Sequence, residues 1–185
     1  MRKNPKRHYL ISTAAVCLMC FLAGCGYTTR SLLPSKYRSI CVENFANKID
    51  ISGETSDLRM YRGYRPGLEA EITEAVTEKF IFDGNLKITD REGADLLLTG
   101  ELLDFAREGI LYDRNDEVEE YRVRLIVDIE LKNARDDTLV WRERNFAGES
   151  TYRTTGSLAK TEDAGVQEAR DDLARRIVER VVEGW

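Results

Sequence analysis

The feature that most constrains the fold is an alternation of apolar and polar residues over residues 121–132, with one exception at Ile126. Tyr121 and every second residue after it up to Leu131 are apolar, and all but one of the residues between and after them are charged. Side chains two residues apart point to the same face of a β-strand. The pattern therefore predicts a long strand with one face in the core and the other in water, within a sheet covered on one side.

Extended segments on both sides of this strand predict an antiparallel meander. Residues 94–105 form a mostly apolar run, in which Gly100 is expected to mark a bulge. Residues 138–146 follow a polar turn and are expected to pair with the alternating strand, with Leu139 and Trp141 on the buried face. Two or three consecutive strands would then lie side by side.

The rest of the domain is expected to contribute two shorter strands and two loops. The strands are predicted at residues 38–45 and 86–89. The polar stretch at residues 46–67 and the Ser-, Thr- and Gly-rich stretch at residues 148–161 are predicted to be loops.

Two amphipathic helices provide the cover for the sheet. Apolar residues at every fourth position predict a helix from residue 66 or 67 to residue 82, stopped by Asp83-Gly84, and a second helix over residues 162–183. The buried stripe of the second helix is expected to hold Val166, Ala169, Leu173, Ala174, Ile177, Val178 and Val181. The predicted class is α+β: two helices packed on one face of a small, largely antiparallel or mixed, four- to five-stranded sheet.

The N-terminus has the layout of an export signal that ends at a cysteine. Basic residues from Arg2 to Arg7 precede an uncharged run at residues 9–22, which is too short for a comfortable membrane span. The run ends in Leu22-Ala23-Gly24-Cys25, which resembles the bacterial lipobox. The resemblance implies that a diacylglycerol is attached to the Cys25 thiol, that the chain is cleaved before Cys25, and that an acyl group such as palmitate is added to the new amine.

This resemblance divides the chain into three parts. Residues 1–24 are expected to be a lipoprotein signal peptide, residues 25–36 a lipidated tether and residues 37–185 a single domain. Gly26 rather than Asp after the cysteine implies the outer membrane by the enterobacterial sorting pattern. Several acyl chains would anchor the protein without a transmembrane helix. The alternative, Cys25 as a small apolar residue ending a buried helix, is disfavoured by the order of basic head, apolar run and small residues before the cysteine.

Loss of the signal peptide would change the chemistry available to the protein. It removes four of the 28 basic residues, none of the 33 acidic ones, and His8, the single histidine. The remaining acidic domain could not build a Ser-His-Asp triad or a histidine-ligated zinc site, and nucleic acid is disfavoured as a partner. Phosphate-binding glycine loops and calcium-loop motifs do not occur in the sequence, so no cofactor or metal is expected. Cys41 is predicted to be a buried strand cysteine.

Carboxylates are the remaining catalytic possibility. Asp104 with Glu108, or Glu119 with Glu120, could serve glycoside hydrolysis if held at the required separation with one pKa raised. In a chain with 33 acidic residues, solvated surface charge is the better interpretation. We therefore expect that the protein is not an enzyme, and a carboxylate-based hydrolase of cell-wall glycan is the less favoured alternative.

Several segments, in this order along the chain, resemble the LptE family of lipopolysaccharide-assembly outer-membrane lipoproteins. They are the lipobox with Gly26-Tyr27, the helix end Phe80-Ile81-Phe82-Asp83-Gly84, residues 94–101, Glu120-Tyr121, Leu139-Val140-Trp141, and residues 172–177. The resemblance covers nearly all of the mature chain. It implies a two-layer fold of helices on a sheet, seated in the lumen of an LptD-like outer-membrane β-barrel, and a role in delivering lipopolysaccharide to the outer leaflet.

The resemblance also implies partners and contact residues. The expected partners are the LptD-like barrel, lipopolysaccharide, and the membrane through the N-terminal acyl chains, with the domain on the periplasmic side or within the barrel lumen. Arg114 and Lys160 lie where family members place basic residues linked to lipopolysaccharide binding, and phosphate groups suit such cations. Both are also ordinary loop charges, and Asp113 and Asp116 lie next to Arg114. A pilot or structural lipoprotein for another secretion channel is the alternative binding function.

Overall fold

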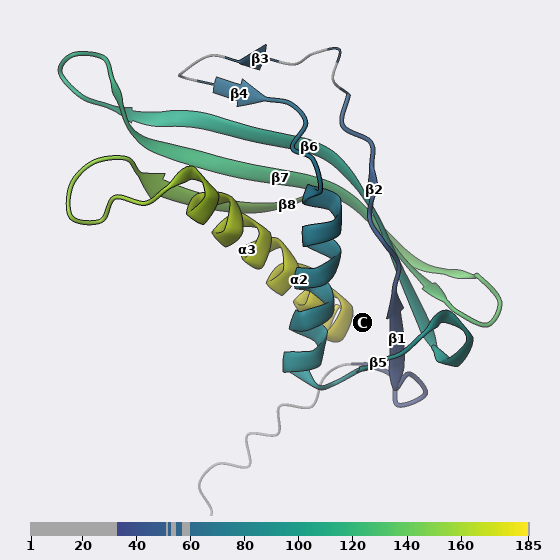
Figure 1. The fold of residues 1–185 in the computed structure, drawn as a ribbon. Helices are drawn as coiled ribbons and strands as arrows, with labels where there is room; N and C mark the ends of the chain where they lie inside the picture. Colours follow the sequence, from purple (N-terminus) through teal and green to yellow (C-terminus); the bar gives the residue numbers. More distant parts are fainter. Residues whose placement is uncertain (1–32, 51, 53–54, 57–59, 185) are drawn as a thin grey trace, which may run out of the picture. The chain divides into compact units, whose positions relative to one another are not determined.

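The computed structural model describes residues 33–50, 52, 55–56 and 60–184, in which one sheet of eight strands is covered by two helices (Figure 1). The three long strands are β6 (Leu96–Tyr112), β7 (Val118–Asn133) and β8 (Leu139–Arg153). The short strands are β1 (Ser39–Val42), β2 (Ala46–Asn47), β3 (Thr55–Ser56), β4 (Met60–Arg62) and β5 (Lys87–Ile88). The helices are α2 (Leu68–Asp83) and α3 (Glu162–Glu183), and a 3-10 turn, η2 (Arg91–Gly93), precedes β6.

The sheet is mixed, and its long strands form the predicted meander. β7 pairs antiparallel with both β6 and β8. The other side of β6 carries three short strands in succession, of which β1 and β2 run parallel to β6 and β4 antiparallel. The α+β class with two helices and a mixed sheet is confirmed. The expected strand number of four to five is wrong, because the predicted loop at residues 46–67 contributes β2, β3 and β4.

The core lies between the helices and one face of the sheet. Alternate residues of β7, from Val123 to Leu131, are fully buried, as the alternation predicts. In α2 the four apolar residues spaced four apart, from Leu68 to Phe80, are also fully buried. All seven residues of the predicted stripe on α3 belong to the same core. Burial of these faces supplies the main driving force for the two-layer packing.

Local hydrogen bonds cap both helices, and the stop at Gly84 is the predicted one. Gly84 caps α2 in the left-handed region, with φ of 74°, and its N–H donates to the Phe80 carbonyl at 3.0 Å. The Thr161 hydroxyl accepts the N–H of Ala164 at 3.2 Å and so caps α3, which spans the predicted residues. No helix in the described part of the chain has both the length and the apolar character needed to cross a membrane.

Two expectations about β6 and β8 are wrong for the same reason, a shift in strand register. The bulge in β6 lies between Leu102 and Asp104 and not at Gly100. A second shift, between Leu131 and Lys132 of β7, places Trp141 opposite Leu131 but Leu139 opposite Lys132. Leu139 therefore leaves the buried face and is 53% exposed. A one-residue slip moves a side chain to the other face of a sheet.

Two glycines lie where a neighbouring part of the chain packs too close to leave room for a side chain. A Cβ on Gly100 would lie 2.1 Å from the Phe45 ring, so this glycine makes room for an aromatic side chain. A Cβ on Gly148 would lie 2.4 Å from the Leu173 Cβ and 2.7 Å from the Ala169 carbonyl oxygen of α3. The expected loop at residues 148–161 is thus strand as far as Arg153, because Gly148 lets β8 lie directly against the helix.

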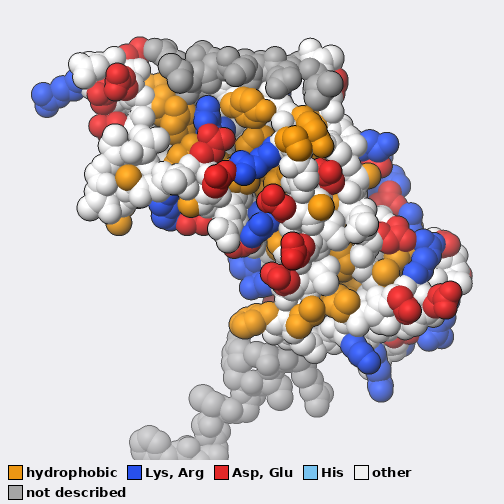
Figure 2. All heavy atoms as spheres, in the orientation of Figure 1, with side chains coloured by type: hydrophobic (Ala, Val, Ile, Leu, Met, Phe, Trp, Pro, Cys, Tyr) orange, Lys and Arg blue, Asp and Glu red, His pale blue; other side chains and the backbone are white. Residues whose placement is uncertain are grey.

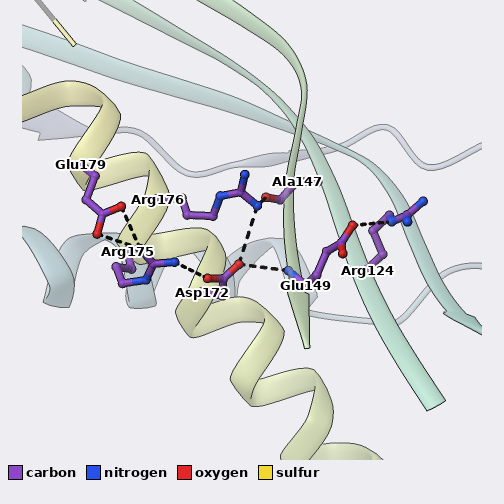
Figure 3. Close-up of polar contacts among 7 residues, drawn as sticks. All are labelled: Arg124, Ala147, Glu149, Asp172, Arg175, Arg176 and Glu179. Carbon is purple, nitrogen blue, oxygen red and sulfur yellow. Dashed lines mark hydrogen bonds and ion pairs between the residues drawn. The ribbon is translucent and has the colours of Figure 1, made fainter. Parts of the chain in front are cut away.

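Side chains of α3 cover the middle of the outer edge of β8 (Figure 3). The Asp172 carboxylate accepts the N–H of Glu149 at 3.2 Å, and the Arg176 guanidinium donates to the Ala147 carbonyl at 2.5 Å. Arg175 donates to the same Asp172 carboxylate at 2.5 Å, and Arg176 lies 3.8 Å from it. These bonds satisfy two main-chain groups of β8, which among the described strands pairs only with β7.

Phe105 is expected to be among the most important residues for stability. Its side chain is 1% exposed, and its ring packs edge to face with Tyr61 at a centroid distance of 5.7 Å. Phe105→Ala should lower the free energy of unfolding by about 3 to 5 kcal/mol, through lost burial and the cavity left behind. Urea unfolding followed by circular dichroism measures this change. Leu111→Ala in the same strand, where the side chain is 40% exposed, should have much less effect, and equal effects would contradict the assignment of the core.

Candidate functional site

The two predicted contact residues, Arg114 and Lys160, come from loops at the same end of the sheet (Figure 1). Arg114 lies in the turn between β6 and β7, and Lys160 lies between β8 and α3. Thr154, at the start of the second loop, links it to β7: its N–H donates to the Glu119 carbonyl and its hydroxyl to the Val118 carbonyl, both at 3.0 Å. The structure therefore brings the two loops to one end of the domain.

Arg114 lies at the tip of a turn that is held together by its acidic neighbour. The Asp113 carboxylate accepts the N–H groups of Glu117 and Asn115, both at 2.8 Å, and these bonds lower the pKa of Asp113. Asp116 adopts a left-handed conformation with φ of 69°. The Arg114 side chain is exposed, and the described residues form no hydrogen bond or ion pair with it. The turn therefore presents its guanidinium to solvent, beside a shallow hollow that is also lined by Tyr112, Asn115 and the acidic residues Asp113 and Glu119.

Lys160 is held more firmly than Arg114. Its ammonium group pairs with the Glu168 carboxylate of α3 at 2.5 Å, and its main-chain N–H donates to the Arg153 carbonyl at 2.8 Å. The side chains of both partners remain nearly half exposed. An anionic ligand would therefore meet Lys160 with its charge partly balanced by an ion pair, whereas Arg114 forms no ion pair with the described residues, although Asp113 and Glu119 line the same hollow.

Large apolar side chains are exposed at the same end of the domain. Leu158, two residues before Lys160, is 72% exposed, and Leu111 and Tyr112, just before the β6–β7 turn, are 40% and 37% exposed. Apolar surface beside exposed cations suits an amphiphilic ligand that carries both phosphate groups and acyl chains.

A packed cluster beneath the two loops fixes their position. The Arg107 guanidinium of β6 pairs with Glu162 in the first turn of α3 and lies 4.8 Å from the ring centroid of Tyr121. Tyr121 stacks on Tyr152 at a centroid distance of 5.5 Å. Gly165 of α3 allows the approach of Tyr152, because a Cβ there would lie 2.4 Å from the ring. The start of α3 is thus tied to all three long strands.

Sequence reasoning missed this cluster. Arg107 faces the helices only because of the register shift between Leu102 and Asp104, which reverses the alternation along β6. Before the shift, Leu98 and Leu102 face the core, and after it Phe105 and Arg107 do so. The sequence signal that could have found the cluster is the Tyr121 that opens the alternating run, but its partner could not be read from spacing.

Two of the four carboxylates considered for hydrolysis, Asp104 and Glu120, form ion pairs. Asp104 accepts two bonds from the Arg62 Nε, at 2.9 and 3.1 Å, and pairs with the Arg62 Nη2 at 2.5 Å. Glu120 pairs with Arg153 at 3.1 Å. Such pairs along a strand are what the surface-charge interpretation predicts.

Cys41 lies in β1 opposite Leu97 and is half-buried rather than buried. Burial, with a smaller contribution from Glu43, raises the pKa of the Cys41 thiol. A thiol with a raised pKa stays protonated near neutral pH and is a poor nucleophile, as expected of a strand cysteine. Cys25 lies outside the described residues, so its lipidation stays a prediction.

Comparison with known proteins identifies the family. A family model described as "LptE: Lipopolysaccharide-assembly" matches residues 37–181. No curated protein matches the chain. Among solved structures, the hypothetical protein CT253 from Chlamydia trachomatis is 12% identical, with a TM-score of 0.49 over 78% of this chain and 95% of that one. A PelC dodecamer from Paraburkholderia phytofirmans is 14% identical, with a TM-score of 0.46 over 84% of this chain and 95% of that one. A minor lipoprotein from Acinetobacter baumannii is 12% identical, with a TM-score of 0.46 over 80% of this chain and 94% of that one. Because the family model spans most of its length, the chain belongs to the LptE family of lipopolysaccharide-assembly proteins.

Proposed function

We propose that the protein is an outer-membrane lipoprotein, anchored through Cys25, that complexes an LptD-like β-barrel and assists lipopolysaccharide transport and assembly at the cell surface. The observation that carries this proposal is the family match over residues 37–181, which includes both Arg114 and Lys160. The lipobox before the matched region supports the anchor. The domain then lies on the periplasmic side of the membrane or within the barrel lumen.

The sheet face opposite the helices supports an environment of this kind. It carries charged residues of β6, β7 and β8, several of them in ion pairs within or between strands. Glu130 pairs with Lys132 at 2.9 Å and with Arg142, and Arg124 pairs with Glu149 at 2.8 Å. The interior of an outer-membrane barrel is polar. A polar face with several internal ion pairs suits contact with such a wall.

Co-purification tests the proposed complex. The full chain with a C-terminal affinity tag, extracted from membranes in detergent, is expected to bring down a large outer-membrane barrel. Depletion of the protein is then expected to lower the amount of lipopolysaccharide at the cell surface. Recovery of a secretion pore instead would favour the pilot-lipoprotein alternative and contradict the proposal.

Arg114→Glu should weaken lipopolysaccharide binding about tenfold or more, because a charge-assisted contact of roughly 1.5 to 3 kcal/mol is replaced by repulsion. Lys160→Glu should have a smaller effect, since Glu168 already balances that charge. Thermal unfolding should change little for the exposed Arg114. Binding is measured with purified lipopolysaccharide.

The matched control is Arg135→Glu, at an exposed arginine between β7 and β8, at the other end of the sheet (Figure 1). Arg135 pairs with Asp95 at 2.9 Å, so this change also reverses a surface charge. Equal losses of binding in the Arg114 and Arg135 variants would indicate a response to total charge and would remove Arg114 from the site.

A further inference from the structure

Two adjacent large apolar side chains are exposed at the C-terminal end of α2. Ile81 is 66% exposed and Phe82 is 85% exposed, whereas Phe80 beside them is fully buried. Figure 2 shows hydrophobic side chains gathered at this end of the helix, in the orientation of Figure 1. An aromatic ring this exposed adds almost nothing to the core, and contiguous exposed apolar surface marks a contact with a partner or a membrane.

This end of α2 lies beside the start of the described domain. Helix α2 leads through Gly84 into β5, whose Lys87 pairs with Ser39 of β1 and donates its N–H to the Arg38 carbonyl at 2.9 Å. Leu33 packs against the same core. The chain therefore enters the domain at the end that carries Ile81 and Phe82.

The length of chain before the domain limits how far a lipid anchor could lie from it. Cys25 precedes Leu33 by eight residues in the sequence. A fully extended chain spans at most 3.3 to 3.6 Å per residue, so eight residues reach about 30 Å. Acyl chains on Cys25 would hold this end of the domain within that distance of the bilayer.

Cations accompany the apolar pair. The Lys79 ammonium lies 5.3 Å from the ring centroid of Phe82, and Lys36 lies 4.6 Å from that of Tyr37. Lys87 is exposed at the same end, where the acidic groups include Glu78 and Asp83 of α2 and Asp171 of α3, which lines the same hollow as Lys79 and Phe82. Apolar side chains that reach the boundary of headgroups and acyl chains, with lysines extending to lipid phosphates, are typical of interfacial membrane contacts.

We infer that Ile81, Phe82 and Lys79 form a membrane-facing surface that rests in the headgroup layer of the bilayer holding Cys25. The inference rests on the proposed function, because it needs the lipid anchor. The anchor sets the distance of the domain from the membrane, and the helix end adds a second point of contact. Two points of contact orient the domain with the Arg114 and Lys160 loops away from this bilayer surface, since Figure 1 places them far from the end of α2.

Tryptophan fluorescence in vesicles tests the inference. The mature full chain carrying Phe82→Trp is reconstituted in vesicles of phosphatidylethanolamine and phosphatidylglycerol, with and without brominated acyl chains. The expected result is a blue-shifted emission and a loss of the added fluorescence on bromination. The parent chain, with Trp141 and Trp185, gives the background. The matched control is Met60→Trp in β4, whose site is 43% exposed at the far end of the domain and should show neither change.

The outcomes separate this inference from the proposed function. Protein that floats with the vesicles and has an acylated Cys25 by mass, but whose Phe82→Trp emission is quenched no more than the parent, overturns the membrane-facing surface alone. Quenching that disappears when the barrel partner is reconstituted also overturns it, because a protein then covers the helix end. Protein that lacks acyl groups and does not float contradicts the anchor itself, and the inference falls with it.

Discussion

Cys25→Ala is expected to leave the full-length precursor uncleaved and to remove acyl anchoring altogether. The cysteine thiol is the attachment point of the diacylglycerol that the lipobox resemblance implies, and cleavage follows that attachment. A buried acyl chain contributes about 0.8 kcal/mol per methylene to membrane binding, so no exposed side chain could replace several such chains. Intact-mass measurement and fractionation of membranes give the result directly.

The sequence offers matched controls for this change. Cys17→Ala and Cys20→Ala lie in the apolar run before the lipobox and should leave processing intact. Cys41→Ala, in β1, should also leave processing intact. Mature-sized, membrane-bound protein from the Cys25→Ala gene would contradict the lipoprotein assignment.

Gly148→Val should be the most damaging single change to the packing of α3 on the sheet. The first added carbon would lie 2.4 Å from the Leu173 Cβ and 2.7 Å from the main-chain oxygen of Ala169, so the helix backbone itself must move. We expect a loss of about 3 kcal/mol in the free energy of unfolding. The clash involves backbone atoms of α3, which cannot relieve it by a rotamer change as a side chain can. The melting temperature should fall by about 6 to 12 °C.

Ala147→Val is the matched control, because it creates the same residue one position earlier, on the opposite face of β8. Ala147 pairs with Ile126 on the sheet face turned away from the helices, where valine suits a strand. Its unfolding should differ little from that of the parent. If Gly148→Val were equally mild, the close approach of β8 and α3 would not hold in solution.

Elements that bury one face along their whole length could be predicted from the sequence. The alternation at residues 121–132 lies within β7, and the stripe from Val166 to Val181 defines α3 to the residue. Periodicity reports burial directly, so these elements carry their own evidence. The end of α2 at Gly84 was also predictable, because glycine tolerates the left-handed cap.

Elements stabilised by distant partners could not be predicted in this way. Strands β2, β3 and β4 have two or three residues each, and β2 and β4 form because β6 offers them main-chain groups to pair with. The end of β8 has the Ser, Thr and Gly composition of a loop and is strand because β7 pairs with it. Tertiary pairing overrides local preference in such segments.

In the candidate site, too, local features could be predicted from the sequence and contacts between distant residues could not. The position of Arg114 in a turn follows from the Asp, Asn and Asp around it, which are turn residues. The pairing of Lys160 with Glu168 does not follow, because eight residues separate them and the first lies outside the helix. Only the fold shows that one of the two predicted cations is partly balanced.

The covering of β8 by Asp172 and Arg176 affects how the protein behaves at high concentration, because it limits aggregation through this strand. An uncovered strand edge recruits strands from other molecules and starts aggregation. Here the middle of that edge already bonds to the chain's own helix, through Glu149 and Ala147. This part of the β8 edge is therefore closed to strands of neighbouring molecules, including other copies of the domain.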